Sequence, residues 1–385
     1  MKDILFARFN HEGPLCDTSF FSVKEAEKVC SFHRSLDEYK ETPLADLRGL
    51  AGRLGVKGFY VKDESPRFGL NAFKGLGGSY VIHKCMEEQR AADNNGQLTF
   101  VTATDGNHGR GIAWAARKMG QRAVVYMPKG SVLERLNNIK AEGAEAFITD
   151  MNYDDTVRFA NKMATENGWI MVQDTAWDGY ETYPAWIMQG YTTMVLEVVK
   201  QLGSTRPTHV FIQAGVGAMA GAVTAFLTEF YGEAYKPKIV IVEPHKANCY
   251  YQTAAANDGI PHSVGGDLDS IMAGLCCGEP CSIGYRIIRD YADWSVSIPD
   301  YIAAKGMRIL AAPAKGDPAV VSGESGAAGV GCAAQILTDP DLEVFKEKLG
   351  LDQNSVILCF STEGDTDKEN YRSIIWDGRY SSAAM

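Results

Sequence analysis

Residues 98–119 read LTFVTATDGNHGRGIAWAARKM, an apolar run that meets a polar, glycine-rich turn and continues into a helical stretch. Leu98–Thr102 is continuous in strand-forming side chains, as expected of a strand buried on both faces. Residues 107–119 then favour a helix. In parallel sheets, ligands bind beyond the carboxyl ends of the strands, at turns of this kind. The stretch therefore predicts a helix-wrapped parallel sheet and also marks where chemistry is expected.

The same strand-to-helix rhythm runs through most of the chain. Further strands are predicted at residues 123–127, 146–148, 170–172, 209–212, 238–242 and 355–360, with helices at 132–141, 154–167, 183–202 and 218–230. This alternation predicts an α/β fold of mostly parallel sheets wrapped by helices. Because 385 residues are many for one hydrophobic core, two domains are expected.

Composition narrows the possible partners. The formal net charge of −10 comes from 48 acidic and 38 basic residues. This negative charge argues against nucleic acid or an anionic membrane as a partner, since a protein that binds either of them needs a basic face. No run approaches a membrane span and the start of the chain resembles no signal peptide, so we expect a cytoplasmic protein with a small-molecule substrate.

The cysteines indicate a reducing compartment, because the nine of them are scattered and odd in number. Cys276, Cys277 and Cys281 lie close together, and a zinc site is conceivable there. A zinc site would need a second pair of cysteines or a pair of histidines at a suitable spacing, and the sequence nearby has neither, so we expect no metal.

Lys74 has an unusual setting, between Phe73 and what reads as a glycine-rich turn (residues 75–78) ahead of a buried helix. An apolar pocket disfavours the ammonium form of a lysine and frees its amine as a nucleophile. The plainer alternative is a surface lysine at the start of a helix.

The turn at residues 104–109 complements the nucleophile, since a helix start presents N–H groups that favour a substrate carboxylate. Its simpler interpretation is a helix N-cap at Thr104, Asp105 or Asn107.

A second unusual turn follows the strand at 209–212. Residues 212–221 read as the end of a strand, a tight turn and the start of a helix, and their small side chains form a candidate phosphate cradle. The alternative is a dinucleotide fingerprint, because Gly215, Gly217 and Gly221 approximate the required spacing and Glu243 closes the next strand. That interpretation predicts an NAD-dependent oxidoreductase. The spacing is one residue too long, however, and it leaves Lys74 without a role.

Four segments carry a family resemblance: residues 67–74 (RFGLNAFK), 102–111 (TATDGNHGRG), 173–180 (QDTAWDGY) and 361–365 (STEGD). With them, the chain resembles the fold type II pyridoxal-phosphate enzymes, the tryptophan-synthase-β-like class that includes the serine and threonine dehydratases. Within that class it is most similar to the diaminopropionate ammonia-lyase family, over roughly residues 40–375. The resemblance implies a small domain at residues 75–185, inserted into a large cofactor-binding domain formed by residues 1–74 and 186–385. It also implies a homodimer.

The resemblance assigns roles toward pyridoxal phosphate. Lys74 would bind the cofactor covalently, Phe73 would sit beside its ring, and Asn107 would hydrogen-bond its phenolic oxygen. The phosphate would lie in the turn formed by Ala214, Gly215, Val216, Gly217, Ala218 and Met219. Thr362 would face the pyridine nitrogen, with Ser361 the less favoured candidate. A neutral hydroxyl there does not force the nitrogen to stay protonated, which suits elimination of a β-substituent.

One departure from the dehydratases separates this chain from them. They usually read Ser-Ser-Gly-Asn where this chain has Thr104, Asp105, Gly106 and Asn107. A carboxylate is a much stronger base than a serine hydroxyl near pH 7. We therefore expect two bases, with Lys74 taking the α-proton from the L enantiomer of diaminopropionate and Asp105 from the D enantiomer. Pyruvate and two ammonia would be the products.

The remaining substrate contacts are also expectations. Thr104, Asp105, Gly106 and His108 lie in the turn that would bind substrate, and Asp174 would bind its β-ammonium group. Asp174 could instead cap the turn before Trp177. His108 could protonate the departing amine or brace its own turn. Three other functions stay open: a serine/threonine dehydratase, the NAD-dependent oxidoreductase, and a ligand-binding protein without activity.

Overall fold

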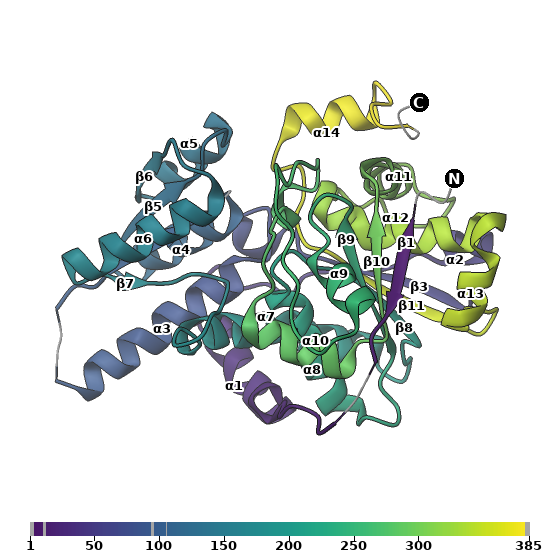
Figure 1. Ribbon diagram of the computed structural model, residues 1–385, viewed down its shortest axis with the longest axis horizontal. Coiled ribbons are helices and arrows are strands. Elements are labelled where there is room, and N and C mark those ends of the chain that lie inside the picture. The colour runs from purple at the N-terminus through teal and green to yellow at the C-terminus, as the bar shows by residue number, and fades with distance from the viewer. Residues whose placement is uncertain (1–3, 11–12, 94–95, 105, 382–385) are drawn as a thin grey trace.

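Two sheets organise the chain, of which the computed structural model describes residues 4–10, 13–93, 96–104 and 106–381. The larger sheet has seven strands in the order β1-β10-β9-β8-β11-β3-β2, and the smaller has four in the order β6-β5-β4-β7. The smaller sheet occupies the left of Figure 1 and the larger sheet the right. The larger sheet comprises β1 (Leu5–Arg8), β2 (Leu44–Asp46), β3 (Gly58–Asp63), β8 (His209–Gln213), β9 (Lys238–Pro244), β10 (Trp294–Ile298) and β11 (Val356–Ser361). The smaller comprises β4 (Thr99–Ala103), β5 (Arg122–Met127), β6 (Glu145–Ile148) and β7 (Ile170–Met171).

Strand pairing is mostly parallel in both sheets, and this confirms the predicted fold class. In the smaller sheet β4 pairs in parallel with β5 and with β7. In the larger sheet β9 pairs in parallel with β8 and with β10. The edge strands β1 and β2 are antiparallel to their neighbours. All residues of β8 and β11 are buried, which explains why these strands read as continuous apolar runs.

Helices cover both sheets. They are α1 (Val23–Arg34), α2 (Arg48–Leu54), α3 (Gly75–Ala91), α4 (Asn107–Lys118), α5 (Leu133–Ala141), α6 (Tyr153–Asn167), α7 (Thr182–Leu202), α8 (Ala218–Tyr231), α9 (Cys249–Ala256), α10 (Ser282–Tyr291), α11 (Asp300–Ala311), α12 (Glu324–Thr338), α13 (Glu343–Leu349) and α14 (Lys368–Ile375). Helices α7, α8 and α10 lie on one side of the larger sheet, and α11 and α12 on the other (Figure 1). Among the described residues, no helix combines the length and apolar character needed to span a membrane.

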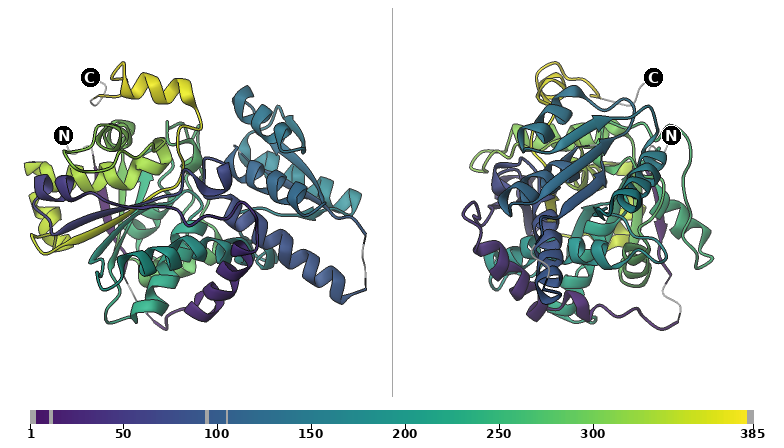
Figure 2. Two further views of the ribbon diagram at one scale, coloured as in Figure 1. Left: turned by 180° about the vertical axis from the view of Figure 1, so that it is seen from behind. Right: turned by 90° about the vertical axis from the view of Figure 1, so that its left-hand side faces the viewer.

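The predicted domain limits separate the strands of the two sheets. Strands β4 to β7 fall between residues 75 and 185, and the seven strands of the larger sheet lie outside this range. The two sheets stand apart along the long axis of the molecule, seen also from behind (Figure 2). A boundary at 74/75 and another at 185/186 therefore remains our proposal for the inserted domain.

The glycines after Lys74 belong to helix α3 and not to a turn, contrary to our expectation. A Cβ on Gly78 would lie 3.0 Å from the backbone carbonyl of Gly111 in α4. A Cβ on Gly190 in α7 would lie 2.6 Å from the Cα of Gly77. The glycines thus let α4 and α7 pack directly against the backbone of α3. Lys74 is held just before the point where the three helices meet.

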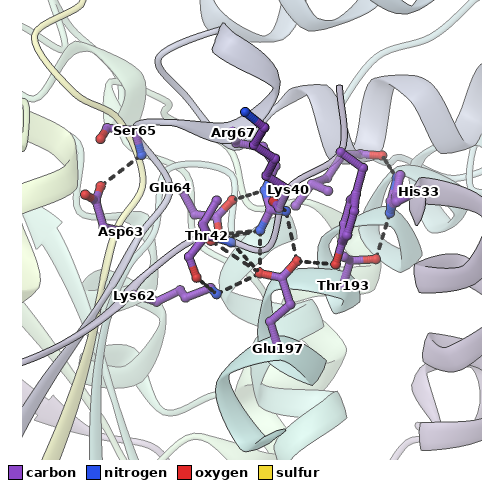
Figure 3. A network of polar contacts seen from close by, with 12 residues as sticks. His33, Lys40, Thr42, Lys62, Asp63, Glu64, Ser65, Arg67, Thr193 and Glu197 are labelled. Carbon is purple, nitrogen blue, oxygen red and sulfur yellow. Dashed lines mark hydrogen bonds and ion pairs between the residues drawn. The ribbon is translucent and has the colours of Figure 1, made fainter. Parts of the chain in front are cut away.

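A buried ion cluster anchors the chain segment that leads to Lys74 (Figure 3). Arg67 forms ion pairs with Glu64 at 2.8 Å and with Glu197 of α7 at 2.7 Å, and Lys62 of β3 pairs with the same Glu197 at 2.7 Å. These four side chains are at most 1% exposed. Buried charges are tolerated only when paired and hydrogen-bonded, so the cluster ties β3 to α7 in one arrangement.

Candidate active site

A cavity lies where the turns after β4, β8 and β11 converge, as the parallel-sheet rule predicts. Thirteen of the predicted site residues line it: Phe73, Lys74, Thr104, Asn107, His108, Asp174, Ala214, Gly215, Val216, Gly217, Ala218, Met219 and Thr362. Gly106 lines an adjoining cavity together with Asn107. Asp105 lies outside the described residues, so its predicted role as a base stays a prediction.

Lys74 donates a hydrogen bond to Oδ2 of Asp174, and the two form an ion pair. The Lys74 side chain is 22% exposed and that of Asp174 is 8% exposed, so the pair is mostly shielded from water. The Nζ atom of Lys74 also lies 5.4 Å from the ring centroid of Phe73. Phe73 in turn packs against Tyr191 of α7, with ring centroids 4.8 Å apart. The apolar setting predicted for this lysine is thus present, with one acidic partner in it.

Asp174 is ionised despite its burial. Burial raises the pKa of this carboxyl, but the neighbouring His108 and Lys74 outweigh that effect and lower the pKa to about 2. His108 is itself buried, and its Nε2 donates to the carbonyl of Val172 at 2.8 Å. Its Nδ1 lies 3.8 Å from Oδ2 of Asp174. His108 therefore joins the turn after β4 to the segment after β7.

Asn107 is the first residue of α4, and its amide reaches across to the larger sheet. Its Nδ2 donates to Oε2 of Glu363 at 2.6 Å. The other oxygen of that carboxylate accepts from the backbone N–H of Ser325 at 3.2 Å, in the first turn of α12. Asn107, Ser325 and Glu363 all line the cavity.

The turn between β8 and α8 forms the floor of the cavity, and its geometry suits a phosphate. Gly217 has a φ of +86°, and a Cβ there would collide with the side chain of Tyr250. A Cβ on Gly215 would lie 3.1 Å from the Cα of Leu275. The start of α8 presents backbone N–H groups without intrahelical partners, which favour an anion. The lysine, the small-residue cradle and the polar side chains opposite together fit pyridoxal phosphate.

Thr362 lies at the end of β11 and faces the same cavity. Its Oγ1 accepts a hydrogen bond from Nε2 of Gln213 at 3.0 Å, and Gln213 also donates to the carbonyl of Phe360 at 2.9 Å. Ser361 is fully buried and bonded to Ser322 at 2.8 Å. This geometry supports Thr362 over Ser361 as the residue facing a pyridine nitrogen.

The dinucleotide interpretation of this turn is wrong, because Glu243 serves another purpose. Its carboxylate accepts from the backbone N–H groups of Tyr250 and Tyr251, each at 2.8 Å, and from Ser295 at 2.9 Å. Burial raises its pKa to about 7. The side chain points into the protein at the start of α9, so it does not reach a ligand in the turn.

Several residues that line the cavity were not among the predicted site residues. They are Tyr153, Gln213, Ala220, Ala273, Gly274, Leu275, Cys276, Cys277, Ser325 and Glu363. Glu363 lies next to Thr362 in the segment 361–365 that carries the family resemblance, whereas Tyr153 and Ser325 carry no sequence signal. Sγ of Cys276 lies 3.5 Å from the carbonyl of Met272. Across the described part of the chain, His, Cys, Asp and Glu side chains form no group of three or more able to hold a metal.

Comparison with known proteins agrees with this cavity. The model of the pyridoxal-phosphate-dependent enzyme family matches residues 36–343. Diaminopropionate ammonia-lyase of Salmonella typhimurium is 50% identical, over 98% of this chain and 100% of that protein. The Escherichia coli K12 enzyme of the same name is 48% identical over 94% of each chain.

Solved structures give the same result. The crystal structure of the Escherichia coli diaminopropionate ammonia-lyase with an aminoacrylate-PLP azomethine reaction intermediate superimposes with a TM-score of 0.91, at 46% identity and 98% coverage of both chains. The same enzyme in complex with D-serine has a TM-score of 0.92, at 45% identity. This chain belongs to the diaminopropionate ammonia-lyase family of pyridoxal-phosphate-dependent enzymes.

Proposed function

We propose that this protein catalyses the α,β-elimination of 2,3-diaminopropionate, in its D and L forms, to pyruvate and two ammonia. The observation that carries the proposal is the cavity in which Lys74 pairs with Asp174 beside a phosphate cradle, in a chain 50% identical to a named diaminopropionate ammonia-lyase. Pyridoxal phosphate, when bound, supplies an electron sink for charge that develops at the substrate α-carbon.

The residues that would hold the cofactor surround the cavity. Lys74 would bind it covalently, the turn at residues 214–219 would hold its phosphate, and Phe73 would lie beside its ring. Asn107 would donate to the phenolic oxygen. Thr362 would donate to the pyridine nitrogen, since its oxygen already accepts from Gln213.

Two bases would then serve the two enantiomers. Lys74 would remove the α-proton of the L form, and Asp105 that of the D form from the opposite side. Thr104, Gly106 and the start of α4 would bind the substrate carboxylate. After the β-amino group leaves, the released enamine hydrolyses to pyruvate and the second ammonia.

Asp174 would bind the β-ammonium group of the substrate. It is ionised, it faces the cavity, and it already binds one ammonium group, that of Lys74. His108 would brace this carboxylate, because its Nε2 is engaged by Val172 and its Nδ1 lies on the Asp174 side. Both assignments rest on these contacts.

The decisive experiment is the release of pyruvate and ammonia from D- and L-2,3-diaminopropionate, assayed separately with pyridoxal phosphate present. Two ammonia per pyruvate from both enantiomers is the expected result. Activity on L-serine with none on diaminopropionate would instead make the protein a serine dehydratase. The Escherichia coli diaminopropionate ammonia-lyase has been solved in complex with D-serine, so serine is an informative second substrate for this assay.

The two-base arrangement has its own test in Asp105→Asn. We expect turnover of the D enantiomer to fall at least about a hundredfold, the usual minimum for losing a general base. Turnover of the L enantiomer should fall much less, because Lys74 is intact. Equal losses for both enantiomers would contradict the division of labour.

We also propose that the protein is a cytoplasmic homodimer, as its class suggests. The dispersed cysteines, none of them in a disulfide among the described residues, agree with a reducing compartment. Light scattering of the purified holoenzyme would give the mass, and a mass of one chain would contradict the dimer.

A further inference from the structure

We propose that Glu363 is a positioning residue, which orients the amide of Asn107 toward the cofactor and ties that orientation to the contact between α4 and the segment after β11. The inference rests on the proposed function, because Asn107 matters here as a cofactor ligand. Glu363 itself has no role in the reaction derived above.

The carboxylate of Glu363 is held between two helix starts. It is 4% exposed. Its Oε2 accepts from Nδ2 of Asn107 at 2.6 Å, and its Oε1 from the backbone N–H of Ser325 at 3.2 Å. Thr366 adds a longer contact, Oγ1 to Oε2 at 3.4 Å. A negative charge is favoured near the N-terminus of a helix, and here the carboxylate bonds to a backbone N–H in the first turn of α12.

The backbone of Glu363 is fixed as well. Its carbonyl accepts from the N–H of Gly323 at 2.9 Å, and it pairs as an isolated bridge with Ala72, two residues before Lys74. A Cβ on Gly326 would lie 2.9 Å from that carbonyl oxygen. The glycine therefore lets α12 approach closely, and the carboxylate projects from a backbone that has little freedom.

The chemistry of the pair decides how the Asn107 amide is turned. A carboxylate only accepts hydrogen bonds, so Asn107 must present its NH2 group to Glu363 and not its oxygen. With one N–H engaged, the second N–H has a fixed direction. Asn107 lines the cavity, and that second N–H is the donor available to an acceptor oxygen on the cofactor. Without the carboxylate, the amide is free to rotate and lose this donor.

The same bond joins the two parts of the molecule. Asn107 begins α4, which follows β4 of the smaller sheet, whereas Glu363 follows β11 of the larger sheet. In Figure 1, α4 lies in the left-hand part of the molecule and β11 in the right-hand part. The amide is therefore oriented only when the start of α4 lies against the segment after β11, which couples cofactor binding to that contact.

A double-mutant cycle tests the proposal, with the dissociation constant of pyridoxal phosphate and the absorption spectrum of the bound cofactor as readouts. Glu363→Gln keeps the size of the side chain. The glutamine amide, however, has only one oxygen. Whichever way it is turned, its NH2 group faces one of the two N–H groups, of Asn107 or of Ser325, that donate to the carboxylate in the wild-type protein. Because hydrogen bonds to charged groups are strong, we expect cofactor affinity to fall roughly tenfold or more. In an Asn107→Ala background the same change should have little further effect.

Matched controls separate this role from a general loss of stability. Glu324 is a neighbouring buried carboxyl, but it bonds to Asn370 at 2.5 Å and not to Asn107. Glu324→Gln should leave cofactor affinity and the absorption spectrum unchanged. If the glutamine variant does not fold, the cycle is repeated with Glu363→Asp. The shorter aspartate side chain draws the carboxylate away from Asn107.

The outcomes are distinguishable. Losses that simply add in the cycle would overturn the proposal, because Glu363 would then act independently of Asn107. An equal loss of affinity in Glu324→Gln would overturn it too. A wild-type protein that forms no covalent complex with pyridoxal phosphate would instead contradict the proposed function itself.

Discussion

Lys74 and Asp174 are 100 residues apart in the chain and form a direct ion pair in the cavity. The carboxylate keeps a low pKa because His108 and Lys74 outweigh the effect of burial on it. A side chain that is both buried and charged is favourable only with such partners. Asp174 is therefore built to hold a cationic nitrogen, whether that of the lysine or that of the substrate.

Asp174→Asn should raise the KM for diaminopropionate at least about tenfold, since a charge-assisted hydrogen bond contributes roughly 1.5–3 kcal/mol. The KM for serine should change less, because serine carries no β-ammonium group. Steady-state kinetics on both substrates measure the difference. Asp178→Asn is the control, as Asp178 lies in the same segment but is exposed. Equal effects on both substrates would remove the assignment.

At the scale of elements, the position of Lys74 depends on how closely α3, α4 and α7 pack. Gly77 and Gly78 bring the backbones of the neighbouring helices into direct contact, with Gly190 and Gly111 as their counterparts. Where backbones touch, no side chain can rotate away to relieve a clash. We therefore expect these contacts to be intolerant of even one methyl group.

Gly190→Ala should lower the free energy of unfolding by about 1–3 kcal/mol, the usual cost of overpacking. Gly52→Ala is the matched control. Gly52 is also within a helix, α2, but a Cβ there meets nothing within 4 Å. That variant should gain roughly 0.5–1 kcal/mol, because alanine favours a helix over glycine. Denaturant unfolding of the cofactor-free proteins measures both, and a neutral Gly190→Ala would refute the tight packing.

For the whole molecule, buried carboxyl groups set how stability depends on pH. Burial raises the pKa of Glu324 to about 7, with the negative charge of Glu363 adding to the effect, and burial raises that of Glu243 to about 7 as well. Both groups favour the folded state while protonated. Their contribution to the free energy of unfolding is fully present below about pH 4.5 and is lost as the pH rises through about 7. Asp174, with its lowered pKa, acts oppositely and loses its contribution only as pH falls below about 4 toward 2.

Between pH 5 and 8 the free energy of unfolding of the wild-type protein should therefore fall relative to that of Glu324→Gln. The shift of Glu324 from 4.5 to about 7, at about 1.4 kcal/mol per pKa unit, limits the difference to about 3 kcal/mol. Glu243 and the histidines are unchanged in the variant, so their contributions cancel when the two proteins are compared. Urea unfolding across this pH range tests the expectation, and parallel curves for the two proteins would contradict it.

Local sequence was sufficient for elements whose side chains have a simple pattern. The continuous apolar runs of β4, β5, β8 and β11 predicted those strands to within one residue or two. Strand β10 went unrecognised because buried Ser295 and Ser297 interrupt its apolar run. Strand β3 went unrecognised because it carries Lys62, a charge that is acceptable there only because Glu197 pairs with it.

The sequence by itself determined the fold class, the reactive lysine and the turns that line the cavity, because these depend on short-range patterns and on a family resemblance. The tertiary structure alone decided which side chains meet across the cavity. It paired Lys74 with Asp174, Asn107 with Glu363 and Gln213 with Thr362, and it turned Glu243 inward. These partners are distant in the chain or face away from the ligand. Local periodicity does not place them. The order of the strands in the sheets and the crossing of the helices bring each of them into position.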